Sequence, residues 1–533
     1  MQIREVQSTP AKKTRRFVDF ILITLFLAFI GGVAYYFQQT RAESASYREA
    51  SENYILYDSS LTSIEQETIK TAIESQKLKI KKQATIKAKY TATPSDMKRV
   101  VETLIPVTQF NAVRQKVTKT ELAGMSVKAP SSFTDVNKRE LAEALKLSED
   151  KIGTYDSLDA ITESEVALIP LAELNYQLKV LWLDDAYYLD SFTSGALFRE
   201  ITIDGAGAES LSQLNLATPV SKDSVYKVNM TGVTALTRVM MRKLDSVRDP
   251  LYFSELIGEF LADADLTHIS NEVSFKEGCV YNNALFCSPP EFIETLKNSG
   301  VDLVELTGNH NNDVGSEYNT QTINTYEQLG WATVGGGLNS EEAAKPFTVD
   351  EKGTKITFLA YNYPDSPNGG AIAGTNKAGA NSFDYEKIES DIQTAKQAGN
   401  FVVVDIQYWE CYAYPDGYDE FPECDKPIGK QEEDFKKVSD LGADIVIGSS
   451  AHQPQTYELY NGKPIYYGLG NLYFEQTSWP GTERGIILTH YFKDGKLLQT
   501  KLTPTVYDKS LQTRIMTDTE ADYLLTRLHD ARY

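Results

Sequence analysis

Two histidine-bearing segments are the best candidates for chemistry in this sequence. His310 lies in "GNHNND" and His452 lies in "SSAHQPQ", and both segments follow apolar runs. A neutral imidazole accepts a proton or binds a metal ion, and a protonated imidazole donates a proton near neutral pH. The two histidines therefore predict acid–base or metal-assisted chemistry, although each could instead only hydrogen-bond the loop at its strand end.

Other polar side chains follow apolar runs in the same way. They occur in "SNE" at 270–272 and in "QYWE" at 407–410. The carboxyl ends of parallel strands lie along one edge of a sheet, where ligands bind. We expect one cleft at such an edge, lined by Asn271, Gln407, Glu410 and Asn471.

The remaining polar residues near these segments have structural interpretations. Asp313 stands just before a predicted helix, and we expect it to cap that helix. His268, His490 and His529 are expected to be structural.

The elements that must position these side chains alternate between strands and helices. Apolar runs predict strands at 226–233, 266–275, 301–307, 401–410 and 443–452, and helical patterns occur between several of them. This alternation predicts a layered α/β domain over residues 224–505. Residues 54–216 have α/β character without a catalytic signature, which indicates a small binding or spacer domain, and residues 506–533 are expected to be a C-terminal tail.

The N-terminal region predicts a membrane anchor. Residues 17–37 are mainly apolar and long enough to cross a bilayer. Basic residues are concentrated in the preceding tail, 1–16, so the positive-inside rule places that tail in the cytoplasm and the chain beyond the linker 38–53 outside. A cleaved signal peptide is the alternative interpretation.

The four cysteines are consistent with an exported chain. Cys279 and Cys287 bracket one short loop, and Cys411 and Cys424 bracket another, so each pair could form a disulfide in an oxidising compartment. Four cysteines allow three pairings, of which the local one is favoured. Zinc binding is a weak alternative, because neither spacing matches a structural zinc site.

The net charge argues against one class of partner. The formal charge is −21, and nucleic-acid binding depends on neutralising phosphates with lysine and arginine. We therefore expect no nucleic-acid partner.

Three segments together resemble a known family. They are "ADLTHISNEVS", "VDLVELTGNHNNDVG" and "GADIVIGSSAHQPQTYELYNGKPIYYGLGNLYF". In this order they resemble the CapA-like PGA_cap family of capsule (poly-γ-glutamate) biosynthesis, over about residues 224–505. The resemblance implies a calcineurin-like metallophosphoesterase fold. The preceding segment, "VALIPLAELNYQLKVLWLDD", is similar to a half-domain of periplasmic-binding-protein type.

The resemblance also implies roles for individual residues. Glu272, Asn309 and His452 would hold a divalent cation such as Mn²⁺, Zn²⁺ or Mg²⁺, and His310 would act as an acid or charge stabiliser, with His452. The cation would activate water for hydrolysis or transfer at a phosphate or amide centre.

This sequence departs from the family pattern at several ligand positions. Val233 follows Gly232 where the family has an aspartate, Gln407 stands for a histidine, and Ser449 and Ser450 occupy positions where histidine may occur. One cation could remain, with Asp405 or Glu410 as substitute ligands, but operation without metal is equally compatible with this ligand set.

The resemblance implies a function in the cell envelope. We expect a single-pass membrane protein that handles an anionic polymer such as poly-γ-glutamate, or its precursor, beside other capsule-synthesis membrane proteins. The alternative is a non-catalytic ligand-binding or scaffold protein on the same fold with a degenerate metal site.

Overall fold

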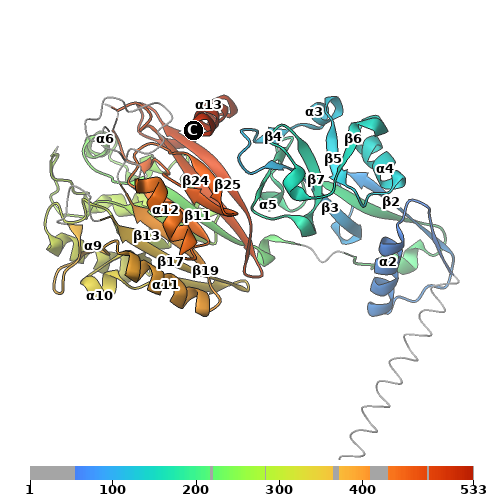
Figure 1. Cartoon of the computed structure of the whole chain (residues 1–533), viewed down its shortest axis with the longest axis horizontal. Helices are drawn as coiled ribbons and strands as arrows, with labels where there is room; N and C mark the ends of the chain where they lie inside the picture. Colours follow the sequence, from blue (N-terminus) through green and yellow to red (C-terminus); the bar gives the residue numbers. More distant parts are fainter. Residues whose placement is uncertain are drawn as a thin grey trace, which may run out of the picture. The chain divides into compact units, whose positions relative to one another are not determined.

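A computed structural model describes residues 54–216, 220–282, 284–363, 371–408, 430–476 and 479–531. These residues form two compact units, whose helices and strands are labelled in Figure 1. One contains residues 54–103 and 198–216, and the other contains 104–197 and 220–531. The described residues contain no helix long and apolar enough to span a membrane. The expected anchor, 17–37, lies outside the described residues.

The smaller unit packs one helix on a short sheet. Strands β1 (Ile55–Tyr57) and β2 (Ala84–Thr91) pair in parallel, and β10 (Leu197–Asp204) pairs antiparallel with β2. Helix α2 (Ser63–Ser75) begins with a capping box, in which the Thr62 and Glu65 side chains each accept from the other's backbone N–H. Its buried Ile69 and Ile73 contact the apolar face of the sheet.

The larger unit begins with a mixed α/β segment. Strand β3 (Val100–Gln109) pairs antiparallel with β7 (Val166–Pro170) and β8 (Leu178–Val180). Strand β5 (Val127–Pro130) pairs in parallel with β7 and β6 (Ile152–Tyr155). The other elements of this segment are β4 (Lys116–Val117), α3 (Lys119–Gly124), α4 (Asp135–Leu145), β9 (Trp182–Leu183) and α5 (Tyr188–Ser191).

This segment packs against the rest of the larger unit through buried polar contacts. Asp190 forms ion pairs with Lys227 and Lys501 and accepts a hydrogen bond from Tyr491. Gln499 donates to the carbonyl of Leu178 at 2.8 Å. The two parts therefore share an interior.

The rest of the unit is a sandwich of two sheets. The first sheet has the order β14-β13-β12-β11-β24-β25-β26, and β23 also pairs with β11. The four strands β11 to β14 are parallel, whereas β24, β25 and β26 add antiparallel neighbours. The strands are β11 (Tyr226–Thr234), β12 (Leu266–Asn271), β13 (Leu303–Glu305), β14 (Ala332–Val334), β23 (Asn471–Tyr473), β24 (Arg484–Lys493), β25 (Lys496–Tyr507) and β26 (Thr513–Ile515).

The second sheet has the order β16-β17-β19-β20-β22-β21. Its central strands β17, β19, β20 and β22 are parallel. The strands are β16 (Phe347–Glu351), β17 (Thr354–Asn362), β19 (Phe401–Gln407), β20 (Ile445–Ser449), β21 (Tyr457–Tyr460) and β22 (Lys463–Tyr466). A separate small pair joins β15 (Gly336–Gly337) and β18 (Gly379–Ala380).

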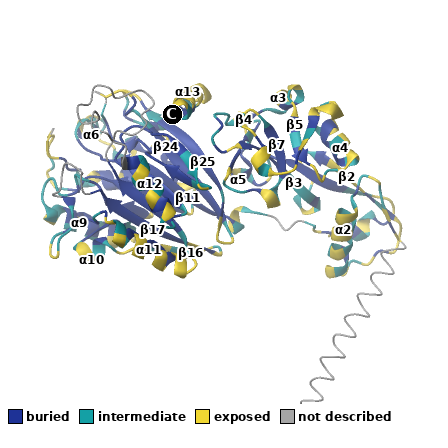
Figure 2. Cartoon of the chain, in the orientation of Figure 1, coloured by how far each residue is buried: buried dark blue, intermediate teal, exposed yellow. Residues whose placement is uncertain are grey.

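Helices cover the outer faces of both sheets. Residues of α7 (Gly258–Ala262), α8 (Ile293–Asn298) and α9 (Ser316–Gln328) pack on the first sheet. Residues of α11 (Tyr385–Gln397) and α12 (Lys430–Asp440) pack on the second. Figure 2 shows β11 and β24 buried, while α12 carries exposed residues on its outer side. The remaining helices are α6 (Val239–Val247), α10 (Ser340–Ala343) and α13 (Asp518–Asp530).

The strand period explains the core between the sheets. Leu266, Leu303 and Val403 point into the inner cluster, while residues at the alternate positions of the strands, such as Ile269 and Val404, contact the helices. The prediction of a layered α/β domain is confirmed. One expectation is corrected: the polar clusters do not end the strands of one sheet, because the clusters at 270–272 and 308–313 belong to the first sheet and those after β19 and β20 to the second.

Residues 506–531 are folded. They include β26 and α13, whose Leu524, Leu525 and Leu528 are buried in the core between the sheets.

Candidate functional site

Polar ends of strands from the two sheets meet at one edge of the sandwich. The Nε2 atom of Gln407, at the end of β19, lies 3.2 Å from Oε1 of Glu272 and 3.2 Å from Oδ1 of Asn309. Glu272 follows β12 and is fully buried. Three of the predicted side chains are therefore in direct contact across the sandwich.

His310 is oriented by Asp313. Its Nδ1 atom lies 2.8 Å from Oδ2 of Asp313, which also accepts from the backbone N–H of Phe286 at 3.0 Å. A carboxylate only accepts, so Nδ1 carries a proton, and in the neutral ring the lone pair is on Nε2. The prediction that Asp313 caps the next helix is wrong: α9 has Gly315 at its N-cap without a side-chain cap.

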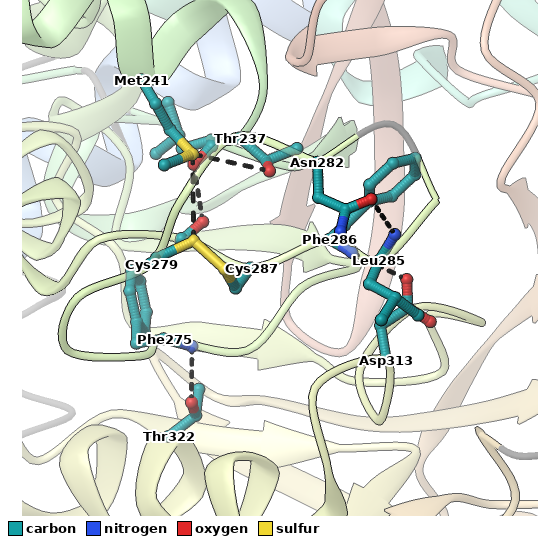
Figure 3. The surroundings of a disulfide bond; sticks show 12 residues. Thr237, Met241, Phe275, Cys279, Asn282, Leu285, Phe286, Cys287, Asp313 and Thr322 are labelled. Carbon is teal, nitrogen blue, oxygen red and sulfur yellow. Dashed lines mark hydrogen bonds between the residues drawn. A yellow bond between two sulfur atoms is a disulfide. The ribbon is translucent and has the colours of Figure 1, made fainter.

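A disulfide holds the loop that supports His310. Cys279 and Cys287 are bonded with their Cα atoms 5.9 Å apart, which confirms this local pairing. Figure 3 shows the backbone N–H of Phe286 facing the Asp313 carboxylate. The Phe286 and His310 rings lie 4.4 Å apart. Cys411 and Cys424 lie outside the described residues, as does Glu410.

His452 is held by Asn471. The Asn471 amide donates to the carbonyl of Thr482 at 2.9 Å, so its Oδ1 atom faces His452 Nδ1, 3.0 Å away. This arrangement places the His452 proton on Nδ1. The His452 ring also contacts Phe474 at 4.9 Å. Asn271, in contrast, donates to Tyr326 of α9 and to the carbonyl of Val273, so its side chain faces the helix layer rather than Gln407.

Arg238 links the two histidines through aromatic rings. Its guanidinium lies 4.9 Å from the Phe286 ring and 4.6 Å from the Phe474 ring, and it donates to the carbonyl of Glu475. Burial lowers the pKa of this guanidinium, while the carboxylates of Glu475 and Glu272 act in the opposite direction. The contacts run from His310 through Phe286, Arg238 and Phe474 to His452.

Sequence reasoning did not select Arg238. The residue stands six positions after Gly232, in a segment that the resemblance already highlighted for its missing aspartate. The available signal was a basic residue just after a strand end.

Val233, which stands where the family has an aspartate, has apolar surroundings in the fold. Val233 is fully buried in a small cluster with Ala235, Val273, Phe286 and Phe474. A carboxylate there would be buried among apolar groups, at a large desolvation cost. The cluster supports the aromatic rings that flank Arg238 instead.

The family comparison agrees with this domain. Residues 227–476 match the model of the family described as "Bacterial capsule synthesis protein PGA_cap". Residues 227–476 are a PGA_cap domain. The resemblance inferred from the three sequence segments is thereby confirmed.

Two curated proteins are similar to this chain. One is "Capsule biosynthesis protein CapA" of Bacillus anthracis, 27% identical over 208 residues, which are 38% of this chain and 47% of the relative. The other is "PGA biosynthesis protein CapA" of Bacillus subtilis (strain 168), 26% identical over 214 residues, which are 40% of this chain and 53% of the relative. The chain spans about half the length of these relatives.

Two solved structures have a distant likeness to the fold. The calcineurin-like phosphoesterase YfkN from Bacillus subtilis has a TM-score of 0.33 at 10% identity, covering 58% of this chain and 99% of that one. The sulfate thiohydrolase SoxB from "Termus thermophilus" has a TM-score of 0.29 at 7% identity, covering 59% and 61%.

A second polar cluster lies deeper in the PGA_cap domain. Ligand atoms of His268 (β12), Glu305 (β13) and Asp405 (β19) lie within 4.8 Å of one another, and all three residues are buried. Burial lowers the pKa of His268 to about 3 and raises that of Asp405 to about 7. The pKa of Glu305 is also raised, by burial and by the charge of Asp405. This cluster is a candidate metal site.

The deeper cluster was only partly anticipated. Asp405 was considered as a substitute ligand at the edge, whereas His268 was expected to be structural and Glu305 was not singled out. The signal was present in the strands, because 268, 305 and 405 are inward positions of apolar runs where a charged side chain is rare.

Proposed function

We propose that this chain is a capsule or envelope polymer protein whose PGA_cap domain binds anionic groups at its polar edge. The family match and the names of the two relatives support a role in capsule biosynthesis, and the name of one of them supports poly-γ-glutamate as the polymer. Residues 17–37 would anchor the chain, with the N-terminus in the cytoplasm and the bulk outside. The Cys279–Cys287 disulfide supports this external placement.

The observation that carries the proposal is the place of Gln407. Its amide nitrogen lies 3.2 Å from the oxygens of both Glu272 and Asn309, which the resemblance names as metal ligands. A hydrogen-bond donor occupies the place of a cation, and Val233 removes the leading carboxylate. The edge residues therefore do not fit a resident divalent cation, and binding without an edge metal is the better-supported function.

Arg238 supplies the charge for such binding. A guanidinium forms two parallel hydrogen bonds with a carboxylate or phosphate, and this one is held by Phe286 and Phe474. His310 and His452 flank these rings. An anionic polymer such as poly-γ-glutamate presents repeated carboxylates that suit this arrangement, and other capsule-synthesis membrane proteins would be the neighbours that pass it on.

Calorimetric titration of the purified chain with γ-linked glutamate oligomers tests the proposal. Arg238→Ala should weaken binding roughly 10- to 100-fold, because a charge-assisted hydrogen bond is lost. Arg242→Ala is the matched control: Arg242 lies four residues later, is exposed and stacks on Tyr281. Equal losses in both variants would indicate unspecific charge attraction and contradict the proposed site.

Acid–base catalysis is a second candidate, favoured by the contact between His310 and Asp313. The geometry leaves the His310 Nε2 lone pair as a base for a water or hydroxyl proton in hydrolysis or transfer. Shortening of the polymer by the wild-type chain, lost in His310→Ala and reduced in Asp313→Asn, would establish it. A wild-type chain that binds the polymer without shortening it would leave the binding function alone.

A further inference from the structure

We infer that His268, Glu305 and Asp405 hold a divalent transition-metal cation between the two sheets of the PGA_cap domain. This internal cation site is separate from the polar edge and does not rest on the proposed function. Each residue comes from a different strand, and Asp405 comes from the opposite sheet, so the ion would join both sheets.

Strand periodicity explains why the three side chains meet. Leu266, Leu303 and Val403 form an apolar layer, and the three cluster residues follow two positions later on the same strands. Two positions further on lie Ser270 of β12 and Gln407 of β19, and Gln407 pairs with Ser449 of β20. The cluster therefore lies one layer beneath the Gln407 contact, inside the sandwich.

The geometry needs only small adjustments to bind an ion. The three ligand atoms lie within 4.8 Å of one another. Nitrogen and oxygen ligands lie about 2.0–2.2 Å from Zn²⁺, so ligand atoms around one ion are roughly 3–4 Å apart. Rotations of the side chains would close the difference.

The electrostatics also favour a positive partner. Glu305 and Asp405 are at most 3% exposed, and Oε1 of Glu305 accepts from the backbone N–H and the hydroxyl of Thr307. Neither carboxylate forms an ion pair among the described residues. Two buried carboxylates without a cation are costly. A divalent ion would neutralise both charges.

Unsatisfied polar atoms converge on the same place. In the described part of the chain, both ring nitrogens of His268, Oε2 of Glu305 and Oδ1 of Asp405 lack hydrogen-bond partners. The hydroxyl of Ser270 lies beside Glu305, and that of Ser449 lies beside Asp405. Buried polar groups are rarely left unpaired, so an ion with bound water beside the two serines would satisfy the set.

The ligand types favour particular ions. Mg²⁺ and Ca²⁺ prefer sites made only of oxygen ligands, whereas an imidazole with carboxylates suits Zn²⁺ or Mn²⁺. The main competing arrangement is a metal-free pair in which Glu305 and Asp405 share protons. The two arrangements predict opposite effects of neutralising one carboxylate.

Elemental analysis of the purified full chain tests the inference. We expect about one equivalent of Zn²⁺ or Mn²⁺ per wild-type chain. The metal content should be about tenfold lower in the near-isosteric variants Asp405→Asn and Glu305→Gln. His452→Ala, at the edge, is the control and should keep its metal. Chelation should lower the melting temperature of the wild type and of His452→Ala, but not that of Asp405→Asn.

Three results would overturn the inference. In the first, the wild type is purified without metal and its melting temperature does not respond to added Zn²⁺ or Mn²⁺. In the second, Asp405→Asn is as stable as the wild type or more stable. In the third, His452→Ala loses the metal and Asp405→Asn keeps it. The second result would favour the proton-sharing pair, and the third would assign the ion to the edge. Circular dichroism of each variant separates metal loss from misfolding, and the wild-type response decides the question if a variant does not fold. Polymer binding through Arg238 could persist in every case.

Discussion

The amide of Gln407 donates to the carboxylate of Glu272 at 3.2 Å, and this contact joins the ends of strands from opposite sheets. The same amide reaches Asn309. One donor thus satisfies two side chains that resemble metal ligands by sequence. Its replacement is the most direct way to ask what this edge is built to hold.

Gln407→Leu should lower the free energy of unfolding by about 1–3 kcal/mol, because the buried Glu272 carboxylate loses a donor. Gln407→Glu should be less stable still, since two carboxylates then face each other. Added Mn²⁺ should stabilise Gln407→Glu more than Gln407→Leu, as measured by chemical denaturation with and without the ion. Equal responses of the two variants to Mn²⁺ would contradict this reading of the edge.

The backbone conformation of Arg238 should lower the stability of the chain. Its φ of 50° and ψ of −114° are unfavourable for residues with a Cβ atom and suit glycine. Arg238→Gly should therefore be more stable than Arg238→Ala by about 1–2 kcal/mol, although both lose the guanidinium. Urea denaturation of the two variants measures the difference. An alanine variant as stable as the glycine variant would show that the backbone relaxes at this position.

The Cys279–Cys287 disulfide should stabilise the loop beside His310. Closing a loop of this size contributes about 2–3 kcal/mol in the chain-entropy model. The double variant Cys279→Ser/Cys287→Ser should lose that amount in unfolding experiments, and Phe286 should lose its fixed position against Asp313. The double variant Cys411→Ser/Cys424→Ser provides a comparison for the other cysteine pair. Unchanged stability without the Cys279–Cys287 bond would mean that the loop is held by its other contacts.

Stability should fall on mild acidification because of His490. This fully buried imidazole has its pKa lowered from 6.5 to about 3, mainly by burial and also by nearby His268. Between these two pH values the unfolded chain binds a proton that the folded chain does not. The stability that depends on the neutral His490 ring is therefore fully present above about pH 6.5 and is lost as the pH falls toward 3. At pH 5 the free energy of unfolding should be lower by about 2 kcal/mol.

Unfolding of wild type and His490→Gln at pH 8, 6.5 and 5 measures this effect. The variant lacks the titrating ring, so its stability should depend less on pH over this range. Parallel profiles for the two proteins would assign the acid sensitivity to other groups.

The local sequence determined the elements and much of the edge. Apolar runs predicted the strands that carry Asn309, Gln407 and His452, because burial between two covered faces requires near-continuous apolar residues. The motif segments predicted the PGA_cap domain, and cysteine spacing predicted the Cys279–Cys287 bond because a short loop brings its own ends together. These features depend on neighbours along the chain.

Which strands face each other depends on the packing of the two sheets. Strand periodicity gives two sides to every strand but does not state that β12 and β19 belong to opposite sheets. The packing of those sheets brought Gln407 to Glu272 and Asp405 to His268 and Glu305. It also turned Asp313 from an expected helix cap into the partner of His310. The first two contacts join side chains more than 90 residues apart in the sequence, and the third depends on the shape of a loop that its surroundings determine. Local sequence patterns do not encode either kind of contact.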